Sequence, residues 1–117
     1  MLEKAQKGEL VFYRLSWAGD YPTMDNFLFP LFYSGSSDNY GQYNNPEVDE
    51  LLLEARSTLD KDERIAKYRE VENIILNDCA FVNIYWPGIG RIIQPYVKGF
   101  VLNNMGYYDL SKVWLEK

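Results

Sequence analysis

Hydrophobic and polar positions alternate near the start of the chain. Residues 10–16 read Leu-Val-Phe-Tyr-Arg-Leu-Ser, and a run of β-branched and aromatic residues with this period predicts a strand. Gly19 and Pro22 follow and mark where the strand ends. Side chains two residues apart on a strand share a face. One face of the expected N-terminal strand therefore carries four residues: Arg14, Ser16, Ala18 and Asp20.

The middle of the chain has a helical period instead. Apolar residues recur three and four positions apart in two segments, from Asn45 to Thr58 and from Asp60 to Leu76, which is typical of helices with one buried face. Asn45 can cap the first helix, where Pro46 is tolerated at the first helical position. Asp60 and Glu63 have the spacing of a capping box. The two segments predict a helical hairpin.

Between the expected strand and the hairpin lies a polar segment rich in aromatic residues, from Tyr21 to Tyr43. Apolar residues over 27–32 suggest a short helical turn, and Asp25 could cap it. The remainder is expected to be a loop. Its tyrosines could line a cleft or simply fill the loop with apolar area.

The last third predicts extended structure. Residues 81–86 and 91–94 are strand-like and flank a Pro-Gly-Ile-Gly turn, which indicates a β-hairpin with a buried first strand. A further extended run is expected over 96–102, a turn over 103–106, and a short strand or helical turn over 107–115. Strands at both ends with helices between them predict an α+β fold, or a piece of an α/β lobe cut from its sheet.

Composition excludes several classes of protein. The chain has no histidine, so it cannot supply a Ser/His/Asp triad or a histidine-based zinc site. Its single cysteine, Cys79, cannot form an internal disulfide, and its position between a helix and a buried strand favours an inert core thiol. The net charge of −5 and scattered basic residues argue against nucleic-acid binding. We expect no cofactor and no metal.

Paired carboxylates could in principle form a glycosidase-like or calcium site, and the pairs are Asp20/Asp25 and Asp60/Asp62. Asp60 and Asp62 are better explained as a helix start, and Asp25 as a cap. Neither pair matches a calcium loop. No residue set supports an enzyme.

The segment Trp17-Ala18-Gly19-Asp20-Tyr21 and the later Asn26-Phe27-Leu28 resemble the Trp-x-x-Asp-Tyr…Asn-Phe-Leu signature near the C-terminus of the extracellular solute-binding proteins of ABC transporters, in the oligopeptide and dipeptide family, family 5. Further similar segments follow in the family's order: Asn45 to Leu52, Asp62 to Arg64, Tyr68 to Glu72, Phe81 to Tyr85, Pro95 to Gly99 and Asp109 to Trp114. The ordered set covers nearly the whole chain.

The resemblance implies a binding site for extended peptides. Asp20 would pair with the ligand's α-ammonium group, a charge-assisted bond, although it could instead cap the turn before Pro22. The main chain around Ser16 and Ala18 would add to the peptide as a strand edge. Trp17 is a ligand contact or a core residue. Arg14 could meet a ligand carboxylate or form an ion pair with a nearby acidic residue. Tyr21 completes the expected ligand-binding residues.

Members of this family are two-lobed chains of several hundred residues, so a chain of 117 residues resembles a C-terminal fragment. Residues 1–95 would form the C-terminal part of one ligand-binding lobe, and residues 96–117 would return to the other. The implied partners are a peptide, the membrane subunits of an ABC permease and the remainder of the full-length protein. Apolar surface left open by the missing part predicts an exposed patch or a homo-oligomeric contact.

The resemblance also implies a periplasmic or extracellular location as a membrane-anchored lipoprotein, with the export signal in the missing N-terminal part. Two alternatives stay open. The ligand could be a nickel complex or an oligosaccharide, which other family members bind. The chain could also be an acidic protein-interaction domain that docks through its helical hairpin, although residues 46–76 show no surplus of outer apolar positions.

Overall fold

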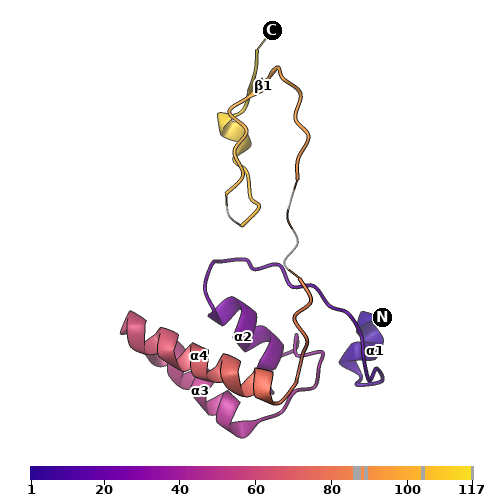
Figure 1. Cartoon of the computed structure of the whole chain (residues 1–117), viewed down its shortest axis with the longest axis vertical. Helices are drawn as coiled ribbons and strands as arrows, with labels where there is room; N and C mark the ends of the chain where they lie inside the picture. The colour runs from indigo at the N-terminus through magenta and orange to yellow at the C-terminus, as the bar shows by residue number, and fades with distance from the viewer. Residues whose placement is uncertain (86–87, 89, 104, 117) are drawn as a thin grey trace. The chain divides into compact units, whose positions relative to one another are not determined.

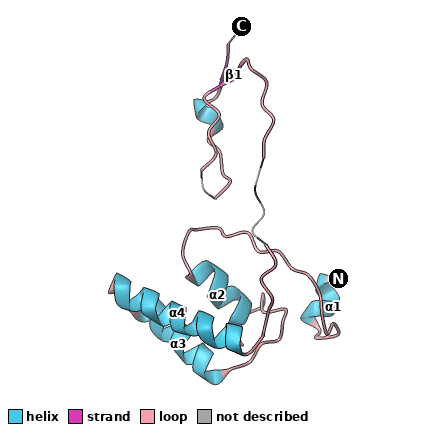
Figure 2. Ribbon diagram, in the orientation of Figure 1, coloured by secondary structure: helices cyan, strands magenta, loops and turns pink. Residues whose placement is uncertain are grey.

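A computed structural model of the protein describes residues 1–85, 88, 90–103 and 105–116. The chain forms two compact units, Met1–Asn83 and Ile84–Lys117, which are described separately below. It is helix-rich with a small antiparallel sheet (Figures 1 and 2), in agreement with the predicted α+β class. Within the described ranges, no helix combines the length and apolar character needed to cross a bilayer.

The first unit is built on three packed helices: α2 (Asp25–Phe32), α3 (Pro46–Ser57) and α4 (Lys61–Asn77). α3 and α4 form the predicted hairpin, and α2 packs against both (Figure 1). The apolar stripes of the three helices meet in one core, made of Leu28, Phe32, Val48, Leu52, Ala55, Tyr68, Val71 and Ile75. A five-residue helix that the sequence pattern did not indicate, α1 (Leu2–Gln6), precedes them.

The helix starts of the hairpin are as predicted. The Asn45 side chain accepts a hydrogen bond from the backbone N–H of Glu47 at 3.1 Å, and Asp60 Oδ1 accepts one from the N–H of Glu63 at 2.9 Å. Each bond satisfies an N–H that has no partner inside its helix. The prediction that Asp25 caps α2 is wrong. Asp25 lies inside the first turn, and α2 has no side-chain cap.

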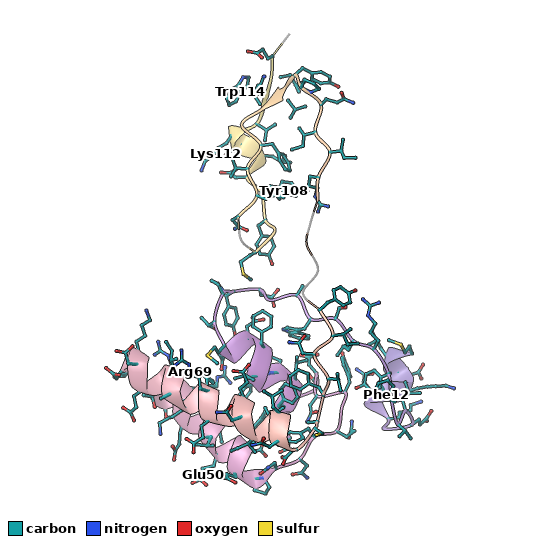
Figure 3. The ribbon with its side chains drawn as sticks, viewed as in Figure 1. Phe12, Glu50, Arg69, Tyr108, Lys112 and Trp114 are labelled. Carbon is teal, nitrogen blue, oxygen red and sulfur yellow. The ribbon has the colours of Figure 1, made fainter. Side chains whose placement is uncertain are left out.

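The predicted N-terminal strand over residues 10–16 is not present. This stretch contains bends and irregular backbone with no strand pairing. Its apolar side chains are uncovered: Phe12, labelled in Figure 3, is 86% exposed. The alternating pattern indicates which residues suit a pleated, half-buried surface. It does not supply the neighbouring strand, and none of the described residues provides one.

The predicted buried strand over 81–86 is also absent from its described part, residues 81–85. Their side chains are exposed, except that Phe81 packs partly on the core through the ring of Phe32, with centroids 5.2 Å apart. Residues 91–94, the expected second strand of the hairpin, are likewise outside any strand. Pro87 and Ile89 of the intervening turn, together with Trp86, lie outside the described residues. As for residues 10–16, the described residues provide no neighbouring strand for this strand-forming sequence.

Cys79 is not a core residue. It follows α4 with a backbone φ of +53°. This left-handed conformation is common at helix ends but unusual for residues other than glycine or asparagine. Its thiol is exposed. The prediction of a buried thiol depended on the buried strand after α4, so it fails together with that strand.

The second unit contains the predicted C-terminal strands. β1 (Val97–Lys98) pairs antiparallel with β2 (Trp114–Leu115), with Val97 opposite Leu115 and Lys98 opposite Trp114. A bridge between Leu102 and Tyr108 continues the pairing. The predicted helical turn is present as a 3-10 helix over Leu110–Lys112, capped by Asp109. Figure 3 labels Tyr108, Lys112 and Trp114 in this unit.

Candidate functional site

The segment around Trp17 is attached to the start of α2 through one asparagine. Trp17 Nε1 donates to the main-chain oxygen of Asn26 at 2.8 Å and to its Oδ1 at 3.1 Å. The same Oδ1 accepts from the backbone N–H of Asp20 at 3.3 Å. Asn26 is only 2% exposed, since it sits on the helix that contributes Leu28 to the core. The loop is therefore fixed to the helical layer by a buried side chain.

The Asp20 carboxylate is exposed. Among the described residues it forms no hydrogen bond or ion pair, while its own backbone N–H is held by Asn26. Capping of the turn by Asp20, the structural alternative, is therefore not observed. A carboxylate whose backbone is held in place and whose oxygens accept no other hydrogen bond is able to bind a cation from solution.

Tyr21, next to Asp20, is held by a second anchor. Its hydroxyl donates to Asp25 Oδ2 at 3.0 Å, and this bond is the main reason that the pKa of Tyr21 is raised. Asp25 Oδ1 accepts from the Tyr68 hydroxyl at 2.9 Å and pairs with Arg56 Nε at 3.2 Å. Burial, followed by the bond to Asp25, raises the pKa of Tyr68. Asp25 thus connects the loop with α3 and α4.

The six predicted ligand-binding residues fall into two groups. Trp17, Asp20 and Tyr21 are brought together over the start of α2 by the bonds described above. The others are Arg14, Ser16 and Ala18, all exposed. Trp17 is partly buried and uses its N–H to hold the loop in place, which favours a structural contribution from this residue.

Two of the loop tyrosines, Tyr33 and Tyr43, pack inside the first unit. Tyr33 stacks on Phe29 with ring centroids 4.6 Å apart, and Tyr43 meets Phe32 edge to face at 5.9 Å. Both rings lie against the core. Asn39, 6% exposed, closes the loop by donating to the main-chain oxygens of Tyr33 and Tyr43. These contacts support the interpretation that the tyrosines fill the loop.

The acidic pairs do not form a metal or acid/base site in the described part of the chain. Within it, no cluster of three or more metal-ligating side chains is found. The oxygens of Asp25 are already bonded to Tyr21, Tyr68 and Arg56, and Asp60 is occupied as a helix cap. Asp60 therefore caps α4 as predicted, whereas Asp25 is not a cap and instead binds Tyr21, Tyr68 and Arg56.

Sequence reasoning missed the contributions of Asn26 and Asp25. Asn26 was part of the Asn-Phe-Leu segment, but spacing gave no indication that its side chain reaches back to Trp17 and Asp20. Buried amides are normally hydrogen-bonded, but the burial of Asn26, which is 2% exposed, is evident only in the structure.

No protein-family profile matches the chain. Among curated proteins, the probable deoxycholate-binding periplasmic protein YgiS of Escherichia coli K12 is 33% identical over 111 residues, which cover 95% of this chain and 21% of that protein. The periplasmic murein peptide-binding protein MppA of the same organism is 33% identical over 103 residues, 88% of this chain and 19% of MppA. The chain thus spans about a fifth of the length of these relatives.

The solved structure of MppA, the murein tripeptide binding protein in its unliganded open form, matches 97% of this chain and 22% of MppA with a TM-score of 0.77 at 30% identity. The fold is that of a segment of the two-lobed periplasmic binding proteins. Within that class, the chain is homologous over most of its length to the oligopeptide- and dipeptide-binding proteins of solute-binding family 5. The resemblance read from Trp17 to Trp114 is confirmed.

Proposed function

We propose that this chain is part of the substrate-binding component of an ABC importer, which binds extended peptides and delivers them to a membrane permease. The observation that carries the proposal is the Asp20 carboxylate, exposed and without a partner among the described residues, on a backbone held by Asn26 at 3.3 Å. Homologues named for peptide binding supply the ligand class.

In this function Asp20 binds the ligand's α-ammonium group. A hydrogen bond to a charged group contributes about 1.5–3 kcal/mol net, and the carboxylate has no competing bond to give up. Ser16 and Ala18 are exposed residues, and their main chain adds hydrogen bonds to the peptide backbone that are independent of peptide sequence. Arg14 faces the ligand's carboxylate end. Tyr21, held by Asp25, borders the ammonium site.

The remainder of the site belongs to a longer protein, because the chain spans about a fifth of its relatives. Residues 96–117 lead back to a second lobe, and closure of the two lobes about a hinge encloses the peptide. Relatives named periplasmic support a location outside the cytoplasmic membrane. In the proposed function the protein is held there as a lipoprotein. The protein binds and releases its ligand without chemical change.

The test compares two probes that differ only at the amine, trialanine and N-acetyl-trialanine, by calorimetry on the complete gene product. Asp20→Asn is expected to weaken trialanine binding by about 10- to 100-fold, the loss of about 1.5–3 kcal/mol. Binding of the acetylated peptide changes little. Asp62→Asn, at an exposed aspartate on the first turn of α4, is the matched control and leaves both affinities unchanged.

Two results would count against the proposal. Unaltered trialanine affinity in Asp20→Asn removes Asp20 from the site. Binding of deoxycholate but of neither peptide would assign the protein to the ligand class for which one relative is named. Deoxycholate carries no amine, so its affinity would not depend on Asp20.

A further inference from the structure

We propose that Asn26 is the positioning residue for Asp20: its buried side chain sets the turn that presents the carboxylate to a ligand's ammonium group. This inference rests on the proposed function and adds to it a residue that contacts no ligand.

Three hydrogen bonds from the Trp17–Asp20 segment converge on Asn26. Its Oδ1 accepts from Trp17 Nε1 at 3.1 Å and from the backbone N–H of Asp20 at 3.3 Å, and its main-chain oxygen accepts a further bond from Trp17 Nε1 at 2.8 Å. One residue therefore holds both ends of the four-residue segment from Trp17 to Asp20. The side-chain oxygen is the only atom of Asn26 shared by both ends.

The helix that carries Asn26 is held rigidly in the core. Asn26 is 2% exposed and stands on α2, whose Leu28 and Phe32 are buried in the core formed with α3 and α4. A side chain enclosed in this way has little rotamer freedom, so its Oδ1 is a fixed point. Gly19 lies within the segment, and glycine gives a backbone more conformational freedom than any other residue, so the segment itself is intrinsically flexible.

Asn26 and Asp25 hold different parts of the loop. Asp25 holds Tyr21, the residue after Asp20, through the bond from the Tyr21 hydroxyl at 3.0 Å. That bond runs through an exposed, long side chain and leaves the Asp20 backbone free to turn. Only Asn26 is bonded to the backbone of Asp20 itself among the described residues. Loss of its amide should therefore release the carboxylate more than loss of the Tyr21 bond.

The experiment uses the complete gene product and the probe pair trialanine and N-acetyl-trialanine. Asn26→Ala is expected to lower the preference for the free amine by about tenfold, the value of one well-placed hydrogen bond expressed as affinity. The acetylated peptide binds nearly as before. In the ¹H–¹⁵N spectrum, the Asp20 amide loses protection against exchange, because its bond goes to Asn26 Oδ1, whereas the Trp17 indole N–H keeps its bond to the main-chain oxygen of residue 26.

Asn39→Ala is the matched control. Asn39 is also a buried asparagine, 6% exposed, and it also closes a loop with bonds to main-chain groups. Its bonds go to Tyr33 and Tyr43, away from Asp20. It is expected to destabilise the fold to a similar extent while leaving the preference for the free amine intact. This separates positioning from general loss of stability.

A double-mutant cycle gives the decisive readout. If Asn26 acts through Asp20, then Asn26→Ala in the Asp20→Asn background adds no further loss of trialanine affinity. Additive losses would overturn the inference, as would a free-amine preference that survives in Asn26→Ala. If the wild-type protein itself fails to prefer trialanine over its acetylated form, the proposed function falls and the inference with it. The two failures are therefore distinguishable.

Discussion

The Tyr68 hydroxyl donates a hydrogen bond to Asp25 Oδ1 at 2.9 Å, across 43 residues of sequence. This bond joins α4 to the first turn of α2. Arg56 of α3 reaches the same oxygen at 3.2 Å and also lies over the ring of Phe29, 4.0 Å from its centroid. Asp25 is therefore the polar contact at which α2, α3 and α4 meet, directly beside the buried Asn26.

Tyr68→Phe is expected to lower the free energy of unfolding of the first unit by about 1.5–3 kcal/mol, the usual value for a hydrogen bond to a charged group. Tyr68 is 4% exposed, so the ring itself stays packed and only the hydroxyl is lost. Urea denaturation followed by circular dichroism measures the change. Tyr21→Phe, which removes an exposed hydroxyl from the same carboxylate, should cost well under half as much. Equal effects of the two substitutions would contradict the stabilising contribution of the buried Tyr68–Asp25 hydrogen bond.

The helix caps give a second stability prediction. Asn45→Ala and Asp60→Ala should each destabilise the hairpin by about 1 kcal/mol, because each leaves a helix N–H without its partner. Asp62→Ala removes a carboxylate from the same turn without removing a cap bond and serves as the control. The midpoint of urea unfolding should shift for the first two variants much more than for the third. No difference among them would mean that the caps are solvated in solution.

The helical part of the fold was predictable because its signals are local. The stripe that contains Val48 and Leu52, and the caps Asn45 and Asp60, depend only on residues within a few positions. The packing of α3 on α4 then follows from a short link between two amphipathic helices. For α2, the apolar positions were sufficient to place the helix, but the partner of Asp25 was not predictable, because Tyr68 is distant in sequence.

The strands were less predictable because a strand is completed by residues elsewhere. Residues 10–16 and 81–85 have strand-forming sequences but belong to no strand in the structure, whereas the two-residue strands β1 and β2 pair with each other. The sequence pattern is the same kind of signal in both cases. Whether a strand forms depends on a neighbouring segment that can pair with it. Among the described residues, only β1 and β2 provide such a segment for each other.

In the candidate site, too, some features were predictable from the sequence and others required the structure. Asp20 and Tyr21 were found through the resemblance, and the structure places them side by side over α2. The contribution of Asn26 required coordinates, because an amide that bonds to residues six and nine positions earlier follows no helical or strand period. The homo-oligomeric contact stays a prediction, although exposed apolar side chains such as Phe12 and Val82 are present as expected.

The turn after β1 depends on a glycine. Gly99 has φ of +74°, and a Cβ atom there would lie 2.0 Å from the main-chain oxygen of Lys112 and 2.5 Å from the Trp114 ring. Both the conformation and the contact exclude a side chain. Gly99→Ala should therefore separate β1 from β2 and destabilise the second unit by more than about 1 kcal/mol.

Exchange protection of the β1 and β2 amides measures this effect. Gly88→Ala is the control, since a Cβ at Gly88 meets no atom within 4 Å. Protection should fall for Gly99→Ala and stay unchanged for Gly88→Ala. A Trp114 environment that is unaltered in Gly99→Ala would show that the close approach to Lys112 is not formed.

The bond between Tyr43 and Asp78 predicts a pH dependence in alkali. The Tyr43 hydroxyl donates to Asp78 Oδ2 at 2.6 Å, and burial followed by this bond raises the pKa of Tyr43 from 10.0 to about 12. A pKa that is higher in the folded than in the unfolded chain stabilises the fold fully below the unfolded value and loses this effect as pH rises through the folded one. The wild-type chain should therefore lose stability between about pH 10 and about 12.

The measurement is the free energy of unfolding across that range, for the wild type and for Tyr43→Phe. The phenylalanine variant cannot ionise at this position, so its stability should fall less steeply with pH. Asp78→Asn keeps the tyrosine but removes the negative acceptor, and tyrosinate absorbance should then show Tyr43 titrating closer to 10.0. Parallel pH profiles for the wild type and Tyr43→Phe would contradict the raised pKa of Tyr43, because a tyrosine whose pKa is the same in the folded and unfolded chain adds no pH dependence to stability.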